Sequence, residues 1–475
     1  MKSFVFPFLL SILISFQLPF HLAFSFWDDA PESLAKTANA PPDSIGYGNK
    51  MIEKQEFLTF KNGCQNSYFY SGSDSFLYLY SETSAPKIMN EGERTPLNIA
   101  LVLDRSGSMQ GDKLKYTLEA AKFVIDNLDE KDIVSIITYE SEVQVVAEAQ
   151  KVTNKQHLKN LIDKIGTGGS TNLSGGMFEG YTQVAKNKSN DYINRVLLMS
   201  DGLANQGIAD SATLVKAVSA KLEETGISLS TFGVGADFNE NLMQSLAEAG
   251  GNYYFINSPY EIPTIFAKEM NGLLLVAAQN LRLTIMTSSE SMTLDKVYGY
   301  RYKQEGGKIT IDFHDIFSKE KKAVLLRFKV NPQGTKTLLI EETIRFTEAS
   351  NGQNHTLNMR TTVNFLEDPA DYSKHYNETV LQQILIFESN DIMEIAMRSV
   401  DNLQYEDAKK QLQGGRKELD FFRGITPEND ELARQDSLYD AYEQNIDSVK
   451  VLKGKELKNY QKDNKMRNYE NRKKK

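Results

Sequence analysis

The chain has 475 residues and a formal net charge of −9 at pH 7, with 40% apolar and 25% charged residues. A chain of this size has room for roughly two to four domains, and this composition is typical of a soluble globular protein with a large core. The acidic balance disfavours a general nucleic-acid-binding role. A single cysteine, Cys64, excludes an intramolecular disulfide and a zinc site built on cysteines. The histidines lie far apart and form no metal-binding pair at helical spacing: His21, His157, His314, His355 and His375.

The first 25 residues have the pattern of a signal peptide. Lys2 precedes an apolar run over residues 4–16, and Ala23-Phe24-Ser25 has the small–x–small form of a signal-peptidase site. We therefore expect residues 1–25 to be cleaved and the protein to be exported, to the periplasm, the cell surface or the medium; an N-terminal membrane anchor is the alternative. Residues 26–54 are polar and predict a linker. No later run approaches the roughly 20 apolar residues that span a bilayer.

A short aromatic segment follows the linker. Residues 67–82 are aromatic and β-prone around a glycine turn, which predicts a hairpin or strand pair. Such strands need a larger sheet, so we expect residues 55–95 to pair with a β unit later in the chain.

Strands alternate with helices over residues 96–275. Residues 97–104 form a continuous apolar run, as expected for a strand buried on both faces of a parallel sheet. Further strands are expected at residues 132–139, 143–147, 195–200, 227–234 and 253–256, and helices at 113–128, 155–165, 173–185, 211–224, 240–249 and 260–274. The fold class predicted by this alternation is α/β, with a doubly wound, mostly parallel sheet.

The pattern then changes to alternation with a period of two. Val324, Leu326, Phe328 and Val330 would share one face of a strand. Residues 276–367 therefore predict an antiparallel, sandwich-like β unit, which the strands of residues 55–95 would join.

Residues 368–475 predict a helical region with a basic tail. Apolar residues at helical spacing indicate antiparallel helices, which Gly414-Gly415 and the segment 424–430 are expected to interrupt. The last 25 residues carry ten lysines and arginines against three acidic residues. We expect a solvated, partly frayed helix there; contact with an acidic lipid, a glycan or a partner is the alternative.

Oxygen-bearing side chains gather where two of the predicted buried strands end. Asp104 ends the first strand and is followed by Ser106 and Ser108, and Asp201 follows the strand at 195–200. Thr171 lies in a glycine-rich loop that precedes a helix. In a parallel α/β sheet, ligands bind beyond the carboxyl ends of the strands. We therefore expect these five side chains at one edge of the sheet.

Four interpretations of this cluster compete. Helix capping explains one oxygen per loop, but not two strand-end aspartates, which repel each other unless a proton or a cation lies between them. A serine nucleophile would need a glycine two residues before Ser106 or Ser108, and neither serine has one. A phosphate cradle would need the G-K-[ST] ending of a P-loop. A divalent cation fits, because Mg²⁺ prefers oxygen ligands and commonly keeps waters beside one or two carboxylates.

The five residues resemble the metal-ion-dependent adhesion site of von Willebrand factor type A (VWA) domains. D-x-S-x-S, a threonine in a glycine-rich loop and S-D-G are all present and in order within residues 97–275. The resemblance implies that the serines and the threonine bind Mg²⁺, Mn²⁺ or Ca²⁺ directly and that the aspartates often act through water. It also implies that an Asp or Glu of a protein partner fills the open position. The flanks resemble those of exported bacterial VWA-domain proteins and, more loosely, of inter-alpha-trypsin-inhibitor heavy chains.

The sequence therefore predicts a non-enzymatic, exported protein that binds a partner through a Mg²⁺-bridged carboxylate. The alternative is a structural scaffold of a cell-envelope assembly, in which the metal fixes local structure only. A metal-assisted hydrolase would need a general base in the three site loops, and only the metal ligands are found there.

Overall fold

The computed structural model describes most of the chain beyond residue 50. The described ranges are 51–55, 57–70, 76–88, 94–201, 206–208, 210–248, 250–287, 292–331, 337–423 and 430–473. The predicted signal peptide and residues 26–50 of the predicted linker lie outside these ranges. The linker prediction is wrong at its end, because residues 52–54 belong to strand β1 (Ile52–Gln55). Among the described residues, no helix combines the length and apolarity that a membrane crossing needs.

The central domain contains a six-stranded sheet in the order β10-β9-β8-β5-β6-β7. All neighbours are parallel except β6 and β7, so the predicted doubly wound α/β class is confirmed. The strands are β5 (Leu97–Asp104), β6 (Ile133–Tyr139), β7 (Val143–Lys151), β8 (Ile193–Ser200), β9 (Ser228–Val234) and β10 (Tyr253–Ile256). The edge strand β7 extends four residues beyond its predicted end at residue 147.

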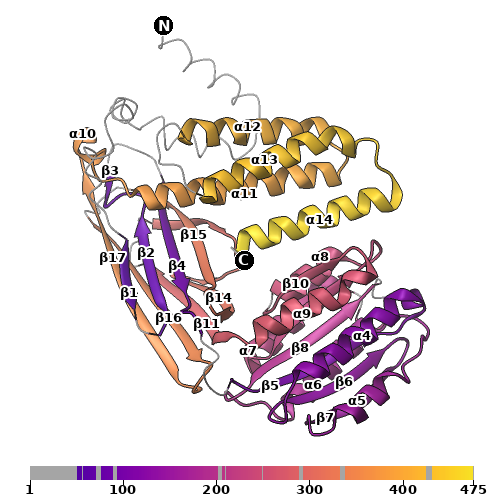
Figure 1. The fold of residues 1–475 in the computed structure, drawn as a ribbon. Helices are drawn as coiled ribbons and strands as arrows, with labels where there is room; N and C mark the ends of the chain where they lie inside the picture. Colours follow the sequence, from indigo (N-terminus) through magenta and orange to yellow (C-terminus); the bar gives the residue numbers. More distant parts are fainter. Residues whose placement is uncertain are drawn as a thin grey trace.

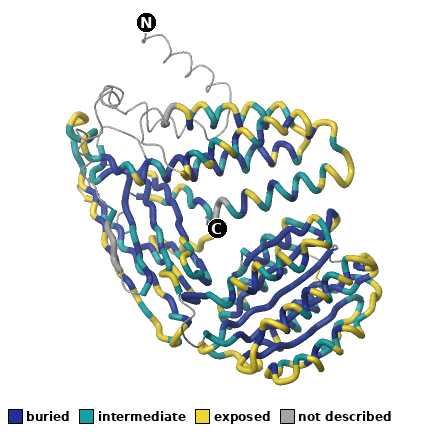
Figure 2. The backbone as a smooth tube through the Cα atoms, in the orientation of Figure 1, coloured by how far each residue is buried: buried dark blue, intermediate teal, exposed yellow. Residues whose placement is uncertain are grey.

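Helices cover both faces of this sheet (Figure 1). They are α4 (Asp112–Asn127), α5 (Lys155–Ile162), α6 (Leu173–Ala185), α7 (Ser211–Thr225), α8 (Glu240–Glu248) and α9 (Ile262–Leu273). Alternate residues of β5 serve opposite cores: Leu101 packs with α4, α5 and α9, and Val102 packs with α6, α7 and α8. This double burial explains why β5 is apolar at nearly every position. Figure 2 shows the buried strands between partly exposed helices.

Two further sheets pack face to face as a β-sandwich. One has the order β1-β2-β4-β15-β12 and the other β13-β14-β11-β16-β17-β3. The strands are β2 (Thr59–Cys64), β3 (Tyr68–Tyr70), β4 (Phe76–Ser84), β11 (Val276–Thr287), β12 (Met292–Tyr298), β13 (Lys303–Glu305), β14 (Lys308–Phe317), β15 (Lys321–Val330), β16 (Thr337–Glu348) and β17 (Asn354–Leu366). Leu79 and Leu326 from the first sheet share a core with Ile285 and Ile344 from the second.

The strands of residues 67–82 do not form the predicted hairpin. β4 pairs with β2 on one side and with β15 on the other, whereas β3 pairs in parallel with β17 in the opposite sheet. Because both edges of β4 are occupied, β3 cannot pair with it. A sequence pattern identifies strands but not their partners, since pairing depends on contacts far along the chain.

The amino edge of the central sheet meets the sandwich. Arg195, near the start of β8, pairs with Asp315 of β14, and both side chains are nearly excluded from water. Burial raises the pKa of Asp315, and the Arg195 charge opposes that rise. A buried pair of this kind is costly to break, because the remaining charge would have no partner.

A carboxyl group lies inside the apolar core of the sandwich. Glu342 of β16 points inward between Ile340 and Ile344 and accepts hydrogen bonds from Asn62 and Ser81 of the opposite sheet. Burial raises the pKa of Glu342 to about 7, although both hydrogen bonds act in the other direction.

This environment predicts a stability that falls with rising pH. The folded state keeps the Glu342 proton up to about pH 7, whereas an unfolded chain releases it near pH 4.5. The free energy of unfolding should therefore fall by at most about 3 kcal/mol between these pH values. Glu342→Gln should remove that fall in denaturant titrations at pH 5 and 8. Glu341→Gln on the outward face is the matched control, and an unchanged fall in Glu342→Gln would contradict the assignment.

The helical region packs on the outer face of one sandwich sheet. Its helices are α10 (Pro369–Tyr372), α11 (Glu378–Asp401), α12 (Tyr405–Arg423), α13 (Asp430–Val449) and α14 (Gly454–Lys473). The predicted interruption at Gly414-Gly415 is wrong, because α12 continues through both residues. A Cβ at Gly415 would lie 2.2 Å from the Tyr439 hydroxyl oxygen and 2.9 Å from Ile392 Cγ2. The glycine permits close helix packing; Gly424 to Asn429, within the other predicted break, lie outside the described residues.

The predicted solvated tail is wrong for residues 462–469, because this part of α14 docks on the central domain (Figure 1). Lys462 is only 3% exposed, and its Nζ donates to the Phe238 carbonyl at 2.8 Å and to Glu240 Oε2 at 2.6 Å. Lys465 Nζ lies 2.9 Å from Glu240 Oε1. Tyr469 packs edge-on against Tyr253, with 5.9 Å between the ring centroids. The local excess of basic residues did not predict this docking, because the acidic partner, Glu240, lies more than 200 residues away in the sequence.

The docking of α14 should depend on the ionisation of Glu240. Burial by itself would raise the pKa of Glu240, but Lys462 and Lys465 outweigh burial and hold it at about 2. The docking contribution should therefore be complete above about pH 4.5 and lost as pH falls toward 2. Glu240→Gln should speed hydrogen exchange in α14 at neutral pH by roughly tenfold.

The control for this experiment removes a surface charge from the same helix. Glu470→Gln breaks only the Lys268–Glu470 pair, whose lysine is largely exposed, and exposed pairs contribute little. Equal exchange in Glu240→Gln and the wild-type protein would show that the Glu240 ion pairs are not needed to hold α14.

Candidate metal centre

Two buried carboxylates lie at the carboxyl edge of the central sheet. Asp104 is the last residue of β5 and Asp201 directly follows β8; they are 0% and 1% exposed. β5 and β8 are adjacent parallel strands, so both side chains reach the same edge. The sandwich meets the opposite, amino edge through Arg195, which leaves the carboxyl edge free of that interface.

The loop after β5 holds Asp104 and aligns two hydroxyl groups. Asp104 Oδ1 accepts from the Ser106 backbone N–H at 2.8 Å, and Asp104 Oδ2 accepts from Ser200 Oγ at 3.0 Å. Ser106 Oγ lies 3.1 Å from Ser108 Oγ, which donates to Asp201 Oδ1 at 2.7 Å. The structure therefore brings four of the five predicted residues into one connected cluster.

The glycine-rich loop brings Thr171 to the same edge. The Gly107 N–H donates to the Gly169 carbonyl at 3.0 Å, and the Gly168 N–H donates to the Arg105 carbonyl at 2.7 Å. Thr171 is buried at the end of this loop, just before the N-cap residue Asn172 of α6. These backbone contacts hold the loop that carries Thr171 beside the serine loop.

Glu140 braces the threonine loop. It follows β6 and accepts from the N–H groups of Gly169 and Ser141, both at 2.7 Å, and it pairs with Arg105 at 3.3 Å. The two backbone hydrogen bonds are the main reason that the pKa of Glu140 is lowered to about 2. A Cβ at Gly168 would lie 2.7 Å from Glu140 Cγ, so this loop needs glycine to approach the carboxylate.

The electrostatics of the cluster favour a cation. Burial raises the pKa of Asp104 to about 6, the Asp201 charge adds to the rise, and hydrogen bonds from Ser106 and Ser200 oppose it. On the other side of the cluster, the Lys113 ammonium group pairs with Asp201 Oδ2. Two carboxylates and several hydroxyl oxygens form a hard donor set of the kind that suits Mg²⁺. Within the described ranges, no cluster of three or more His, Cys, Asp or Glu residues could hold a metal ion.

Sequence reasoning missed three contributors to this edge. Ser200 holds Asp104, Lys113 pairs with Asp201, and Glu140 braces the threonine loop. Glu140 carried the same signal as the two aspartates, a carboxylate at the end of a buried strand. The sequence signal of Lys113 was weaker: it is a basic residue in the first turn of the helix that follows the serine loop.

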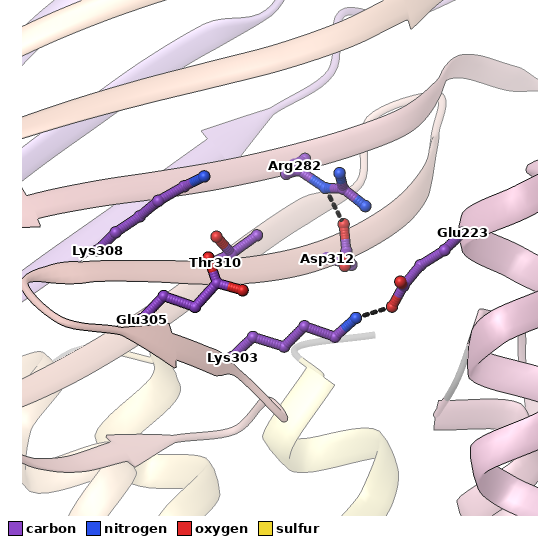
Figure 3. Close-up of a pocket in the computed structure, with 7 residues that line it drawn as sticks. All are labelled: Glu223, Arg282, Lys303, Glu305, Lys308, Thr310 and Asp312. Atoms are coloured by element: carbon purple, nitrogen blue, oxygen red, sulfur yellow. Dashed lines mark hydrogen bonds and ion pairs between the residues drawn. The ribbon is translucent and has the colours of Figure 1, made fainter.

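A polar pocket of about 330 Å³ lies away from this edge, between α7 and the sandwich (Figure 3). It is lined by Glu223, Arg282, Lys303, Glu305, Lys308, Thr310 and Asp312. Lys303 pairs with Glu223 of α7, and Arg282 pairs with Asp312 at 2.5 Å. Its three basic and three acidic side chains balance, so its charge favours neither anions nor cations.

The central domain matches a known family of domains. Residues 98–268 match the family of the von Willebrand factor type A domain. Two solved structures share the fold over most of this chain. The ArnB paralog VWA2 from Sulfolobus acidocaldarius is 17% identical with a TM-score of 0.59, and covers 83% of this chain and 97% of its own. A von Willebrand factor type A protein from Catenulispora acidiphila is 14% identical with a TM-score of 0.61, and covers 78% of this chain and 90% of its own.

Curated relatives match part of this chain. The uncharacterized protein YfbK of Escherichia coli (strain K12) is 32% identical over 210 residues, which are 44% of this chain and 36% of that protein. Inter-alpha-trypsin inhibitor heavy chain H2 of Mesocricetus auratus is 29% identical over 164 residues, which are 32% of this chain and 17% of that protein. This chain thus spans well under half the length of these two relatives. VWA domains generally mediate protein–protein interaction or adhesion and commonly bind a divalent metal.

The brace on the threonine loop can be tested directly. Glu140→Gln should weaken the hydrogen bonds to Gly169 and Ser141, because a neutral amide oxygen is a poorer acceptor than a carboxylate. The amides of residues 168–171 should then exchange with solvent about fivefold faster or more. Glu142→Gln, an exposed neighbour, is the control. Equal protection of the loop in both variants would contradict the bracing role.

Proposed function

We propose that the carboxyl edge of the central domain binds a divalent cation, Mg²⁺ or else Mn²⁺ or Ca²⁺, which recruits a carboxylate of a protein partner. Ser106, Ser108 and Thr171 would be direct ligands, and Asp104 and Asp201 would act mainly through water. This proposal rests mainly on a row of contacts between three of these residues. Ser106 Oγ lies 3.1 Å from Ser108 Oγ, and Ser108 Oγ lies 2.7 Å from Asp201 Oδ1. The membership of residues 98–268 in a family of interaction modules supports it.

The hydrogen bonds of Asp104 support a water-mediated role. One of its oxygens accepts from the Ser106 N–H and the other from Ser200 Oγ. Both oxygens of the carboxylate are thus engaged in hydrogen bonds, which favours contact with the cation through a water molecule. Ser108 and the loop residues 166–169 are exposed, so a bound cation would be reachable by an incoming side chain.

A non-enzymatic role fits this chemistry. The bound cation would supply electrostatic attraction for an Asp or Glu carboxylate, and the three loops contain no histidine that could act as a general base. We also propose export, on the pattern of residues 1–25. The scaffold role stays the alternative, in which the cation stabilises the loops and recruits no partner.

Metal binding should depend on Asp104. Asp104→Ala should abolish the binding of Mg²⁺ and Mn²⁺ in calorimetry, because it removes one of two carboxylates and the acceptor that orders Ser106 and Ser200. Asp112→Ala removes an exposed carboxylate from the start of α4 and is the matched control. Equal affinity in Asp104→Ala and the wild-type protein would contradict the site assignment.

Partner binding should depend on the metal and on Thr171 together. Without metal, Asp104 and Asp201 would repel an incoming carboxylate, so EDTA should weaken binding by about a hundredfold or more. Thr171→Ala should weaken it without unfolding the domain. Pull-downs from envelope extract with and without EDTA provide the measurement. A metal-independent partner would exclude this binding mode, and metal binding with no metal-dependent partner would favour the scaffold role.

A further inference from the structure

Lys113 is the basic residue that contacts the candidate metal centre. It lies in the first turn of α4, and its ammonium group pairs with Asp201 Oδ2 while Ser108 Oγ donates to Asp201 Oδ1. The Lys113 side chain is 27% exposed, whereas that of Asp201 is 0% exposed. The two oxygens of Asp201 therefore face different neighbours, a hydroxyl ligand on one side and a fixed positive charge on the other.

The helix does not explain this lysine. The first turn of a helix carries a partial positive charge, which disfavours a cation there and favours an acidic residue such as the preceding Asp112. The end of the Lys113 side chain lies near Gly235, which follows β9; a Cβ at Gly235 would lie 3.7 Å from Lys113 Cε. Lys113 thus reaches from the start of α4 toward the ends of β8 and β9, and the carboxylate accounts for its position.

We propose that Lys113 is a built-in counter-ion of the metal centre that lowers its affinity for divalent cations, an inference that rests on the proposed metal site. Without a metal, the ammonium group neutralises one of the two buried carboxylates and stabilises the folded edge. With a metal, the ammonium group repels the cation and draws part of the Asp201 charge away from it. The same contact therefore stabilises the metal-free protein and weakens metal binding.

Lys113 also fixes the net charge of the loaded centre. Two carboxylates, one ammonium group and one divalent cation leave a single positive charge. Without the lysine the loaded centre would be neutral. Lys113 thus keeps the loaded edge attractive to an anionic group at the expense of metal affinity.

Calorimetric titration of the full chain with MgCl₂ and MnCl₂ tests this inference. Lys113→Met should bind either metal roughly tenfold more tightly or better, because a like charge is removed from a partly buried site. Lys113→Arg keeps the charge and should stay within about threefold of the wild-type affinity. Lys115→Met, two residues along α4 and exposed, removes the same formal charge away from Asp201 and should change affinity little.

Thermal unfolding gives a readout that does not depend on measuring affinity. In EDTA, Lys113→Met should unfold at a lower temperature than the wild-type protein, because Asp201 loses its counter-ion. Adding Mg²⁺ should raise its unfolding temperature by more than it raises that of the wild-type protein. If Lys113→Met does not fold, Lys113→Gln, which keeps a hydrogen-bond donor without the charge, takes its place in both measurements.

The outcomes separate this inference from the proposed function. If the wild-type protein binds Mg²⁺ and the neutral variant binds it equally or more weakly, Lys113 is no counter-ion although the metal site stands. Tighter binding in Lys115→Met as well would trace the effect to general surface charge and overturn the specific role of Lys113. If neither the wild-type protein nor the neutral variants bind a divalent cation, the metal site itself is absent and the inference fails with it.

Discussion

The carboxyl edge of the central domain is organised by two buried carboxylates on adjacent parallel strands. Burying one charge is costly and burying two like charges is more so, unless nearby groups compensate. At this edge the compensation comes from a backbone N–H, two serine hydroxyls and one ammonium group, all within the contacts of Asp104 and Asp201. One of these two hydroxyl groups, that of Ser108, is also a ligand of the proposed cation, so at Ser108 the requirements of stability and of the proposed metal binding coincide.

The rest of the chain occupies other surfaces of the central domain. The sandwich takes the amino edge, where the buried pair of Arg195 and Asp315 joins the two units. Helix α14 takes the side of β10, where Lys462 and Lys465 meet Glu240. Part of the positive charge of this basic segment is therefore balanced within the chain. The carboxyl edge, with Ser108 and residues 166–169 exposed, lies outside both of these contacts.

The sequence errors share one physical cause. The expected hairpin, the expected break at Gly414-Gly415 and the expected solvated tail were all inferred from local pattern. Each was decided by a distant contact: both edges of β4 are paired, Gly415 lies against Tyr439, and Lys462 lies against Glu240. A glycine pair or a run of lysines has a local preference, but contacts with distant residues decide which structure it adopts.

The sequence by itself determined the α/β class of the central domain. A strand buried on both faces must be apolar throughout, and the apolar residues of the helices that cover it must recur with a period of 3.6 residues. The sequence also placed Asp104, Ser106, Ser108 and Asp201 at or just beyond the ends of two strands, since loops that follow parallel strands reach one edge. Only the tertiary structure decided that Ser200, Lys113 and Glu140 complete that edge, and that Glu342 sits inside the sandwich. Those roles depend on contacts between residues that are far apart in the sequence, and the order of residues along the chain does not show which of them come together in space.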